Sequence, residues 1–196
     1  MGSTFKLFTA AIALDSGRVG LRDRYDATKP IRVSRFKISD YHAKNKWMTV
    51  PEILVHSSNI GSAKMALDVG TRAQRKYLKN MGMLSPAGIE LPEVGSPLTP
   101  DRWRDINTMT ISYGHGIAVS PLQLTTGVAA LVNGGYLRTT SANNYIFDHN
   151  FNVSFNNIEI AEDFNLSDKN SSIMLRNLQS KVVIEDVFEK ELSLSG

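Results

Sequence analysis

Two short groups of residues carry side chains that can do nucleophilic chemistry together. In the first group, Ser3 and Lys6 lie three residues apart, in a stretch whose apolar residues recur at helical spacing: Phe5, Phe8, Ala11 and Ile12. Side chains at this spacing share one helix face, so the lysine amine can reach the serine hydroxyl. Burial beside apolar residues lowers the pKa of a lysine, and the neutral amine can then act as a base for the serine. The same pair also suits a helix N-cap followed by a surface lysine.

The second group is Ser57-Ser58-Asn59, which lies 54 residues after Ser3. We expect it in a loop between two helices, where its side chains can face a cleft. There the Ser57 hydroxyl can relay a proton, and the Asn59 amide can hold a substrate carbonyl or the base. Serine and asparagine are also common in turns and at helix caps. Taken by itself, this group leaves both interpretations open.

Start and stop signals predict the helices that position these groups. The helix that carries Lys6 begins at an N-cap Ser3 and ends by Ser16-Gly17. The run Thr49-Val50-Pro51-Glu52 combines a Thr N-cap, a Pro in the first turn and a Glu three residues after the cap. We therefore predict a short helix over residues 51–56, the loop 57–59, and further helices over residues 61–69 and 71–81.

The remaining stretches are less regular. Residues 18–50 are polar and broken, with β-leaning pieces around residues 31–38, and the prolines of residues 84–105 favour an extended loop. The glycines of residues 111–116 predict a strand end or a turn. An apolar helix begins at Ser120-Pro121, runs to Val132 and closes at Asn133-Gly134-Gly135. We interpret His115, the one histidine expected near the site, as a packed or exposed side chain.

Composition excludes several classes of function. The 196 residues are 42% hydrophobic and 21% charged, as in an ordinary globular domain, and the lack of cysteine excludes disulfides, thiolate zinc sites and a cysteine nucleophile. We expect no metal site and no cofactor. The longest apolar stretch, residues 7–14 with Thr9 as its one break, is far shorter than the ~20 residues of a membrane span. We therefore expect no membrane span, signal peptide or anchor in this chain.

Charge and composition change along the chain. The net charge of +3 combines +8 over residues 1–140 (18 basic, 10 acidic) with −5 over residues 141–196 (4 basic, 9 acidic). The basic residues are scattered without interleaved aromatics, so we expect no nucleic-acid binding. Residues 1–140 hold 13 of the 14 glycines and all 7 prolines. We therefore predict one domain over residues 1–140 and a divergent acidic tail, rich in Asn and Ser, over residues 141–196, with a strand at 145–155 and a helix at 167–187.

Several blocks along the chain, taken together, carry more information than either chemical group alone. They occur in one order over residues 2–138: Gly2-Ser3-Thr4-Phe5-Lys6, Thr49-Val50-Pro51-Glu52-Ile53-Leu54, Ser57-Ser58-Asn59-Ile60-Gly61, Ala63-Lys64-Met65-Ala66-Leu67-Asp68-Val69-Gly70, Ile111-Ser112-Tyr113-Gly114-His115-Gly116, Ser120-Pro121-Leu122-Gln123-Leu124 and Asn133-Gly134-Gly135. In order and spacing the chain resembles the transpeptidase domain of class B penicillin-binding proteins, the septal (FtsI-like) or elongation peptidoglycan transpeptidases. Ser-x-x-Lys combined with Ser-x-Asn is typical of penicillin-binding proteins.

The resemblance implies both a fold and roles for the site residues. The fold would be α/β (α+β), with helices around a central antiparallel sheet, and this chain would hold mainly the helical part with the sheet incomplete. Ser3 would be the acylated nucleophile, and its backbone N–H half of the oxyanion hole. Lys6 would be the general base. Ser57 would pass the proton to the leaving group, and Asn59 would bind the substrate amide.

The resemblance also implies partners and a location. The substrates would be peptidoglycan stem peptides that end in D-Ala–D-Ala, and β-lactams would react with the same serine. Proteins of the divisome or of the elongation complex would be partners in the family. The family works at the periplasmic face of the bacterial inner membrane.

The sequence departs from the family at its third motif. No Lys-Thr-Gly or Lys-Ser-Gly occurs in it, whereas in the family this motif holds the substrate carboxylate and precedes the second oxyanion donor. The family also has sheet strands before Ser3 and after residue 196, so we expect a partial domain. Because loss of one oxyanion donor alone typically costs about 10²–10³ in rate, we expect little or no transpeptidase activity from this chain.

Other interpretations share these motifs. A catalytically inactive remnant, or a non-catalytic binding fragment, would belong to the same family as a working transpeptidase and differ from it only in catalytic activity. A serine β-lactamase of the same superfamily would deacylate rapidly, but residues 122–124 and 133–135 look like those of the transpeptidases. A helical adaptor with chance motifs is disfavoured because too many matching blocks occur in order.

Overall fold

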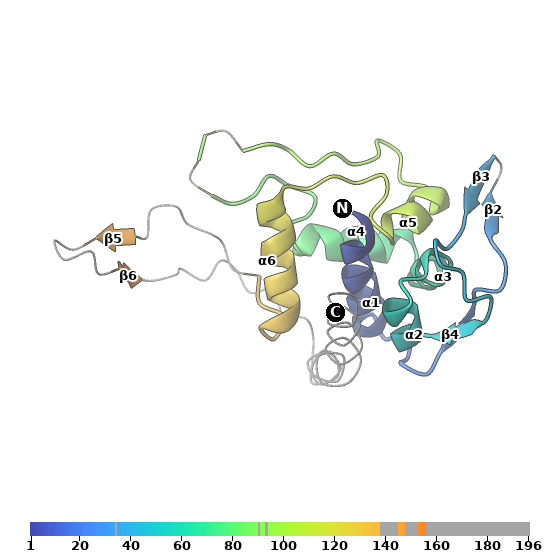
Figure 1. The fold of residues 1–196 in the computed structure, drawn as a ribbon. Coiled ribbons are helices and arrows are strands. Elements are labelled where there is room, and N and C mark those ends of the chain that lie inside the picture. Colours follow the sequence, from blue (N-terminus) through green and yellow to red (C-terminus); the bar gives the residue numbers. More distant parts are fainter. Residues whose placement is uncertain (34, 90, 93, 138–144, 148–152, 156–196) are drawn as a thin grey trace, which may run out of the picture.

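One helix lies at the centre of the described structure. The computed structural model describes residues 1–33, 35–89, 91–92, 94–137, 145–147 and 153–155 (Figure 1). The central helix, α1 (Phe5–Asp15), follows a single 3₁₀ turn, η1 (Gly2–Thr4). It contacts α2, α3, α4 and α6. The other helices are α2 (Val50–Val55), α3 (Asn59–Val69), α4 (Thr71–Asn80), α5 (Asp105–Ile111) and α6 (Pro121–Val132).

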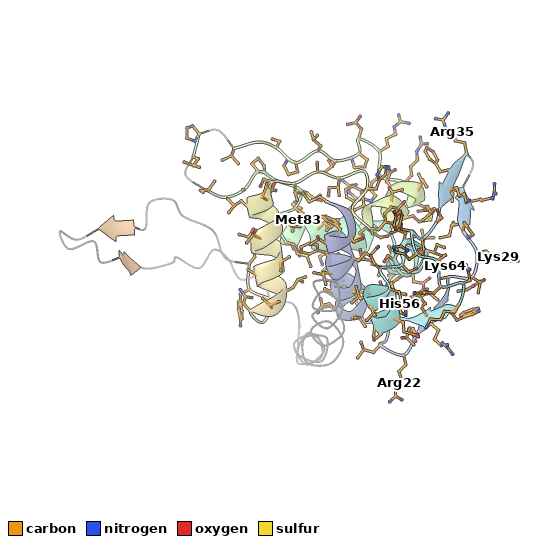
Figure 2. All side chains as sticks on the ribbon, viewed as in Figure 1. Arg22, Lys29, Arg35, His56, Lys64 and Met83 are labelled. Atoms are coloured by element: carbon orange, nitrogen blue, oxygen red, sulfur yellow. The ribbon has the colours of Figure 1, made fainter. Side chains whose placement is uncertain are left out.

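Most of α1 is buried. Eight of its 11 residues are buried, and the rings of Phe5 and Phe8 lie 5.3 Å apart between centroids. Burial of one such ring stabilises the folded state by about 2–3 kcal/mol. Met83, labelled in Figure 2, packs between α1 and α6, because a Cβ on Gly127 would lie 2.1 Å from Met83 Cε and 3.0 Å from Phe8 Cε1. Contacts on so many sides give Lys6 a fixed place in the fold.

The strands of the described residues form short antiparallel pairs. β1 (Arg24–Asp26) pairs with β4 (Trp47–Thr49), and β2 (Ile31–Val33) pairs with β3 (Phe36–Ile38). β5 (Tyr145–Phe147) pairs with β6 (Val153–Phe155). The β2–β3 hairpin confirms the strand tendency predicted around residues 31–38. Helices combined with small antiparallel sheets agree with the predicted α/β class.

The segment between α1 and α2 presents basic side chains to solvent. Arg22, Lys29 and Arg35 are exposed and point away from the helices in Figure 2. Lys64 of α3 instead turns toward this segment, and its Nζ donates to the carbonyl oxygen of Asp26. The polar character of residues 18–50 therefore reflects an excursion that covers α3 with its inner side and faces water with its outer side.

The predicted helix starts at residues 49–52 and 120–121 are confirmed. Thr49 and Glu52 form a capping box in which each residue's side chain accepts from the other's backbone N–H. Hydrogen bonds from Lys46 and from the Thr49 backbone lower the pKa of Glu52 to about 2. Ser120 and Gln123 form a second capping box at the start of α6. The observed ends of α2, α3, α4 and α6 differ from the predicted ends by at most two residues.

One local prediction is wrong, and another is confirmed in one of its two alternatives. Ser3 does not cap a helix, because it lies within η1, which has no side-chain cap hydrogen bond. Thr4, the N-cap residue of α1, makes no side-chain cap hydrogen bond either. Residues 112–116 follow α5, a helix that the sequence does not predict. They form the turn that the glycines of residues 111–116 predict, but at the end of a helix rather than of a strand. α5 is short and polar, and a tertiary contact supports it: the Gln74 side chain donates to the Thr108 carbonyl oxygen at 3.0 Å.

The tail is described only in part. β5 and β6 lie within residues 145–155, so the stretch predicted as one strand contains two paired strands. The predicted helix over residues 167–187 and the predicted boundary at residue 140 lie outside the described residues, and both stay predictions. Among the described helices, none is long and apolar enough to cross a membrane.

Candidate active site

Three of the four predicted site residues meet around one amine. Lys6 Nζ donates to Ser3 Oγ at 3.1 Å, to Ser57 Oγ at 2.8 Å and to the Ser57 carbonyl oxygen at 2.6 Å. Ser57 Oγ in turn donates to Ser3 Oγ at 2.9 Å. The two hydroxyls and the amine therefore form a closed triangle, in which Ser57 lies more than 50 positions from Ser3 and Lys6 along the chain.

Burial changes the proton affinity of this amine. Lys6 is 2% exposed, whereas Ser3 and Ser57 are exposed. Desolvation lowers the pKa of Lys6 from 10.5 to about 8, and the charge of Asp40 opposes this shift by raising it. At pH 7 roughly a tenth of the molecules then carry a neutral Lys6. A buried, partly neutral amine next to an exposed hydroxyl can take the proton of that hydroxyl during nucleophilic attack.

Ser57 occupies a backbone conformation that usually belongs to glycine. Its φ is +51°, in the left-handed region. Ser57 N–H donates to the Leu54 carbonyl oxygen at 3.0 Å, and Ser58 N–H to the Ile53 carbonyl oxygen at 2.9 Å. This is the Schellman pattern that closes a helix with a left-handed residue, here at the end of α2. A serine at this position costs about 1 kcal/mol or more in backbone strain, so its presence points to the use of its hydroxyl.

Asp40 joins the 57–59 loop to the segment that follows β3. Its Oδ2 accepts from Ser58 Oγ at 2.8 Å, and its Oδ1 accepts from the Ile60 backbone N–H at 2.9 Å. Ser58, which is fully buried, also caps α3 by accepting from Gly61 N–H at 2.9 Å. The carboxylate therefore fixes the start of α3 and, with it, the loop that carries Ser57.

Asn59 lies beside the triangle without a hydrogen bond to it. Its Nδ2 donates to the Ser39 carbonyl oxygen at 2.9 Å, which leaves its Oδ1 available for another donor. The structure thus brings Ser3, Lys6 and Ser57 together, whereas the Asn59 amide group points toward the residues that follow β3. His115 is exposed on the turn after α5.

The sequence analysis missed Asp40. It lies 18 residues before Ser58, in a segment predicted only as polar and broken, and a single sequence offers no local pattern that links the two. The bonds of this carboxylate depend on how residues 18–50 fold back over α3. Within the part of the chain that the structure describes, no group of three or more His, Cys, Asp or Glu side chains could hold a metal ion.

Comparison with known proteins identifies relatives by sequence. The probable peptidoglycan D,D-transpeptidase FtsI of Caulobacter vibrioides is 43% identical over 138 residues, which are 70% of this chain and 23% of the relative. The peptidoglycan D,D-transpeptidase FtsI of Escherichia coli is 32% identical over 142 residues, 71% of this chain and 24% of the relative. The chain therefore spans about a quarter of the length of these curated relatives.

Solved structures share the fold. The transpeptidase domain of penicillin-binding protein 3 from Burkholderia pseudomallei matches with a TM-score of 0.74 and 23% identity, over 94% of this chain and 54% of that one. A peptidoglycan glycosyltransferase from Burkholderia ambifaria matches with a TM-score of 0.76 and 24% identity, over 94% of this chain and 56% of that one. The family model for the penicillin binding protein transpeptidase domain matches residues 1–183. The chain therefore belongs to the penicillin-binding protein transpeptidase domain family.

Proposed function

We propose that this chain carries the nucleophile and base of a peptidoglycan D,D-transpeptidase, with Ser3 as nucleophile and Lys6 as general base. The observation that supports this most is the position of Lys6 Nζ, 3.1 Å from Ser3 Oγ and 2.8 Å from Ser57 Oγ. A general base must lie within hydrogen-bond reach of the proton it removes, and its pKa should lie near the working pH. Lys6, with a pKa of about 8, meets both conditions.

Acylation follows from this arrangement. Ser3 Oγ attacks the carbonyl carbon of the penultimate D-Ala of a stem peptide, and its proton moves to the neutral amine of Lys6. The proton then passes through the Ser57 hydroxyl to the nitrogen of the terminal D-Ala as the C–N bond breaks. The products are an ester on Ser3 and free D-alanine. An amine of a second stem peptide attacks the ester, forms the cross-link and returns the proton to Ser3.

The remaining roles concern binding of the substrate. The Asn59 side chain binds the substrate amide, and the backbone N–H of Ser3 donates to the developing oxyanion. A β-lactam reacts as the stem peptide does, because Ser3 opens its ring and the leaving nitrogen stays attached. In the whole protein this reaction belongs to cell-wall synthesis at the periplasmic face of the inner membrane, with divisome or elongation-complex proteins as partners.

The sequence holds no Lys-Thr-Gly or Lys-Ser-Gly, the third motif of the family. In the family this motif clamps the substrate carboxylate, and clamping contributes to rate by holding the reacting atoms in place. We therefore expect acylation of Ser3 in these 196 residues to be specific but slow, at least about 10²-fold below a family member that carries the motif. The rate of Ser3 acylation therefore distinguishes an inactive fragment from a working enzyme.

Intact-mass spectrometry after incubation with benzylpenicillin tests the proposal. The unmodified chain should gain one penicilloyl group over hours, and peptide mapping should place it on Ser3. Ser3→Ala should gain none, whereas Ser96→Ala, which changes an exposed serine of the loop before α5, should behave as the parent. A folded chain that gains no adduct would contradict the proposal and favour an inactive fragment. Labelling at the rate of a motif-bearing relative would contradict the expected role of the third motif.

A further inference from the structure

The turn that ends α5 lies directly against the residue that precedes Ser3. A Cβ built on Gly114 would lie 2.2 Å from the carbonyl oxygen of Gly2 and 2.6 Å from its amide nitrogen. Real Cβ atoms essentially never approach other atoms this closely. The neighbours here are backbone atoms, which cannot rotate away as the end of a side chain can. Position 114 therefore has room for the hydrogen atom of a glycine but not for a Cβ atom.

Hydrogen bonds hold this turn in place from two sides. Gly114 N–H donates to the Ile111 carbonyl oxygen at 2.9 Å, and His115 N–H donates to the Thr110 carbonyl oxygen at 3.0 Å. The two bonds form the Schellman motif that closes α5, with Gly114 in its left-handed position at φ +81°. From the other side, Thr9 Oγ1 donates to the Ser112 carbonyl oxygen at 2.7 Å. The turn is thus fixed to α1, the same helix that carries Lys6.

The other partner of this contact, η1, is held by Phe5 N–H, which donates to the Gly2 carbonyl oxygen, and by the Ser3 hydroxyl, which accepts from Lys6 and Ser57. It has no side-chain cap hydrogen bond, and Gly2 itself has a φ of +60°. Ser3 is the middle residue of η1, and its Oγ must stay within 3.1 Å of Lys6 Nζ for the triangle to remain closed. The backbone contact between Gly114 and Gly2 sets how far η1 can lie from the helix core.

We infer that Gly114 is a positioning residue for Ser3, because its turn holds the preceding backbone of Gly2 in place. A side chain at position 114 pushes η1 outward, separates the Ser3 hydroxyl from Lys6 and admits water to the amine. The placement of Ser3 follows from the contact itself. The effect on acylation rests in addition on the proposed function.

A matched pair of substitutions separates this contact from backbone strain. Gly116 has a φ of +84°, close to the +81° of Gly114, but a Cβ on Gly116 would meet only Thr110 Oγ1, at 3.5 Å. Gly114→Ala and Gly116→Ala therefore introduce the same left-handed strain, and only Gly114→Ala collides with Gly2. Gly116→Ala should lower the thermal midpoint through this strain alone, by about 2–4 °C per kcal/mol for a chain of this size, and Gly114→Ala should lower it further because of the collision.

Two quantities are measured. The pKa of Lys6 is followed by NMR on the protein with isotope-labelled lysine, and the rate of acylation is measured with benzylpenicillin. Gly114→Ala should raise the pKa of Lys6 from about 8 toward its ordinary value, because water reaches the amine, and should slow acylation at least tenfold. Gly116→Ala should leave both unchanged. Asp40, the charged group that acts on Lys6, is present in all three proteins. Equal effects of the two variants on the pKa and the rate would overturn the inference.

The two measurements, the Lys6 pKa and the acylation rate, distinguish failure of the inference from failure of the proposed function. If the parent chain gains no penicilloyl group, the proposed function fails and the NMR comparison still decides the role of Gly114. If Gly114→Ala does not fold, Thr9→Val removes the hydrogen bond that ties the turn to α1 and keeps the side-chain volume. Thr9→Val should raise the pKa of Lys6 in the same direction by a smaller amount, and an unchanged pKa would overturn the inference.

Discussion

Lys6 Nζ donates to both oxygens of Ser57, at 2.8 Å to the hydroxyl and 2.6 Å to the carbonyl. The carbonyl oxygen can only accept, so this bond holds the amine whether or not it is protonated. The hydroxyl can donate or accept, so it can follow a change in the protonation of the amine. One residue of the α2–α3 connection therefore both anchors the base and offers it a proton path.

The pH dependence of acylation should report Lys6. Only the neutral amine can take a proton, so the rate should rise about tenfold per pH unit below the Lys6 pKa of about 8 and level off above it. Asp40→Asn should move the midpoint to lower pH, because the charge of Asp40 raises that pKa. Asp101→Asn, at an exposed carboxylate, serves as control. A midpoint that Asp40→Asn leaves in place would contradict this account of the electrostatics.

Stability should depend on pH through the same group. The pKa of Lys6 is about 8 in the folded chain and near 10.5 when unfolded, so between these values the unfolded chain binds more protons and stability rises with pH. Below pH 8 both states hold the proton and the penalty is fully present. Denaturant unfolding from pH 7 to 9.5 should show the parent gaining up to about 1.4 kcal/mol per pH unit relative to Lys6→Met above pH 8. Parallel curves for the two proteins would contradict the burial of a charged amine.

The left-handed backbone of Ser57 predicts an unusual order of stability. Ser57→Gly and Ser57→Ala both remove the hydroxyl, but only glycine relieves the strain at φ +51°. Ser57→Gly should therefore be about 1 kcal/mol more stable than Ser57→Ala, while both acylate more slowly than the parent. Gly82→Ala, at the corresponding position after α4 with φ +71°, should lose about the same 1 kcal/mol. Equal stability of the two Ser57 variants in denaturant unfolding would contradict the strain.

The contact between α2 and α3 predicts a core that tolerates no added methyl group. A Cβ on Gly61 would lie 2.5 Å from Ile53 Cγ1 and 2.8 Å from Cδ1, and Ile53 is fully buried. Gly61→Ala should destabilise the chain by about 1–3 kcal/mol. The double variant Gly61→Ala/Ile53→Ala should lose less than the sum of the two single changes, because each relieves the other. Additive losses in a double-mutant cycle would show that the two positions do not compete for space.

The sequence was enough to predict those parts of the fold that local rules determine. The capping box of Thr49 and Glu52 and that of Ser120 and Gln123 are short-range patterns, so the helices that follow them were predictable. Ser3, Lys6, Ser57 and Asn59 were selected by spacing together with family resemblance, and three of them meet in the structure. Their chemical roles stay proposals until acylation is measured.

Features that depend on distant contacts could not be predicted in this way. α5 has no strong apolar period, and the hydrogen bond from Gln74 that supports it comes from α4. Asp40 binds Ser58 and Ile60 only because residues 18–50 fold back over α3. The glycine at position 114 was predicted as part of a turn, but its need for hydrogen alone arises from Gly2, more than 100 residues earlier. In each case the determining partner lies outside any local window of sequence.

The most direct test of the central claim, that Lys6 activates Ser3, is the rate and location of modification by a small sulfonyl fluoride. Such a reagent transfers its sulfonyl group to Ser3 Oγ with loss of fluoride and has no carboxylate, so it does not depend on the third motif. Peptide mapping of the chain at pH 8 should place the modification on Ser3. Lys6→Met should react at least tenfold more slowly, and Ser96→Ala should react as the parent does. Modification spread over several serines, or an equal rate in Lys6→Met, would contradict the claim.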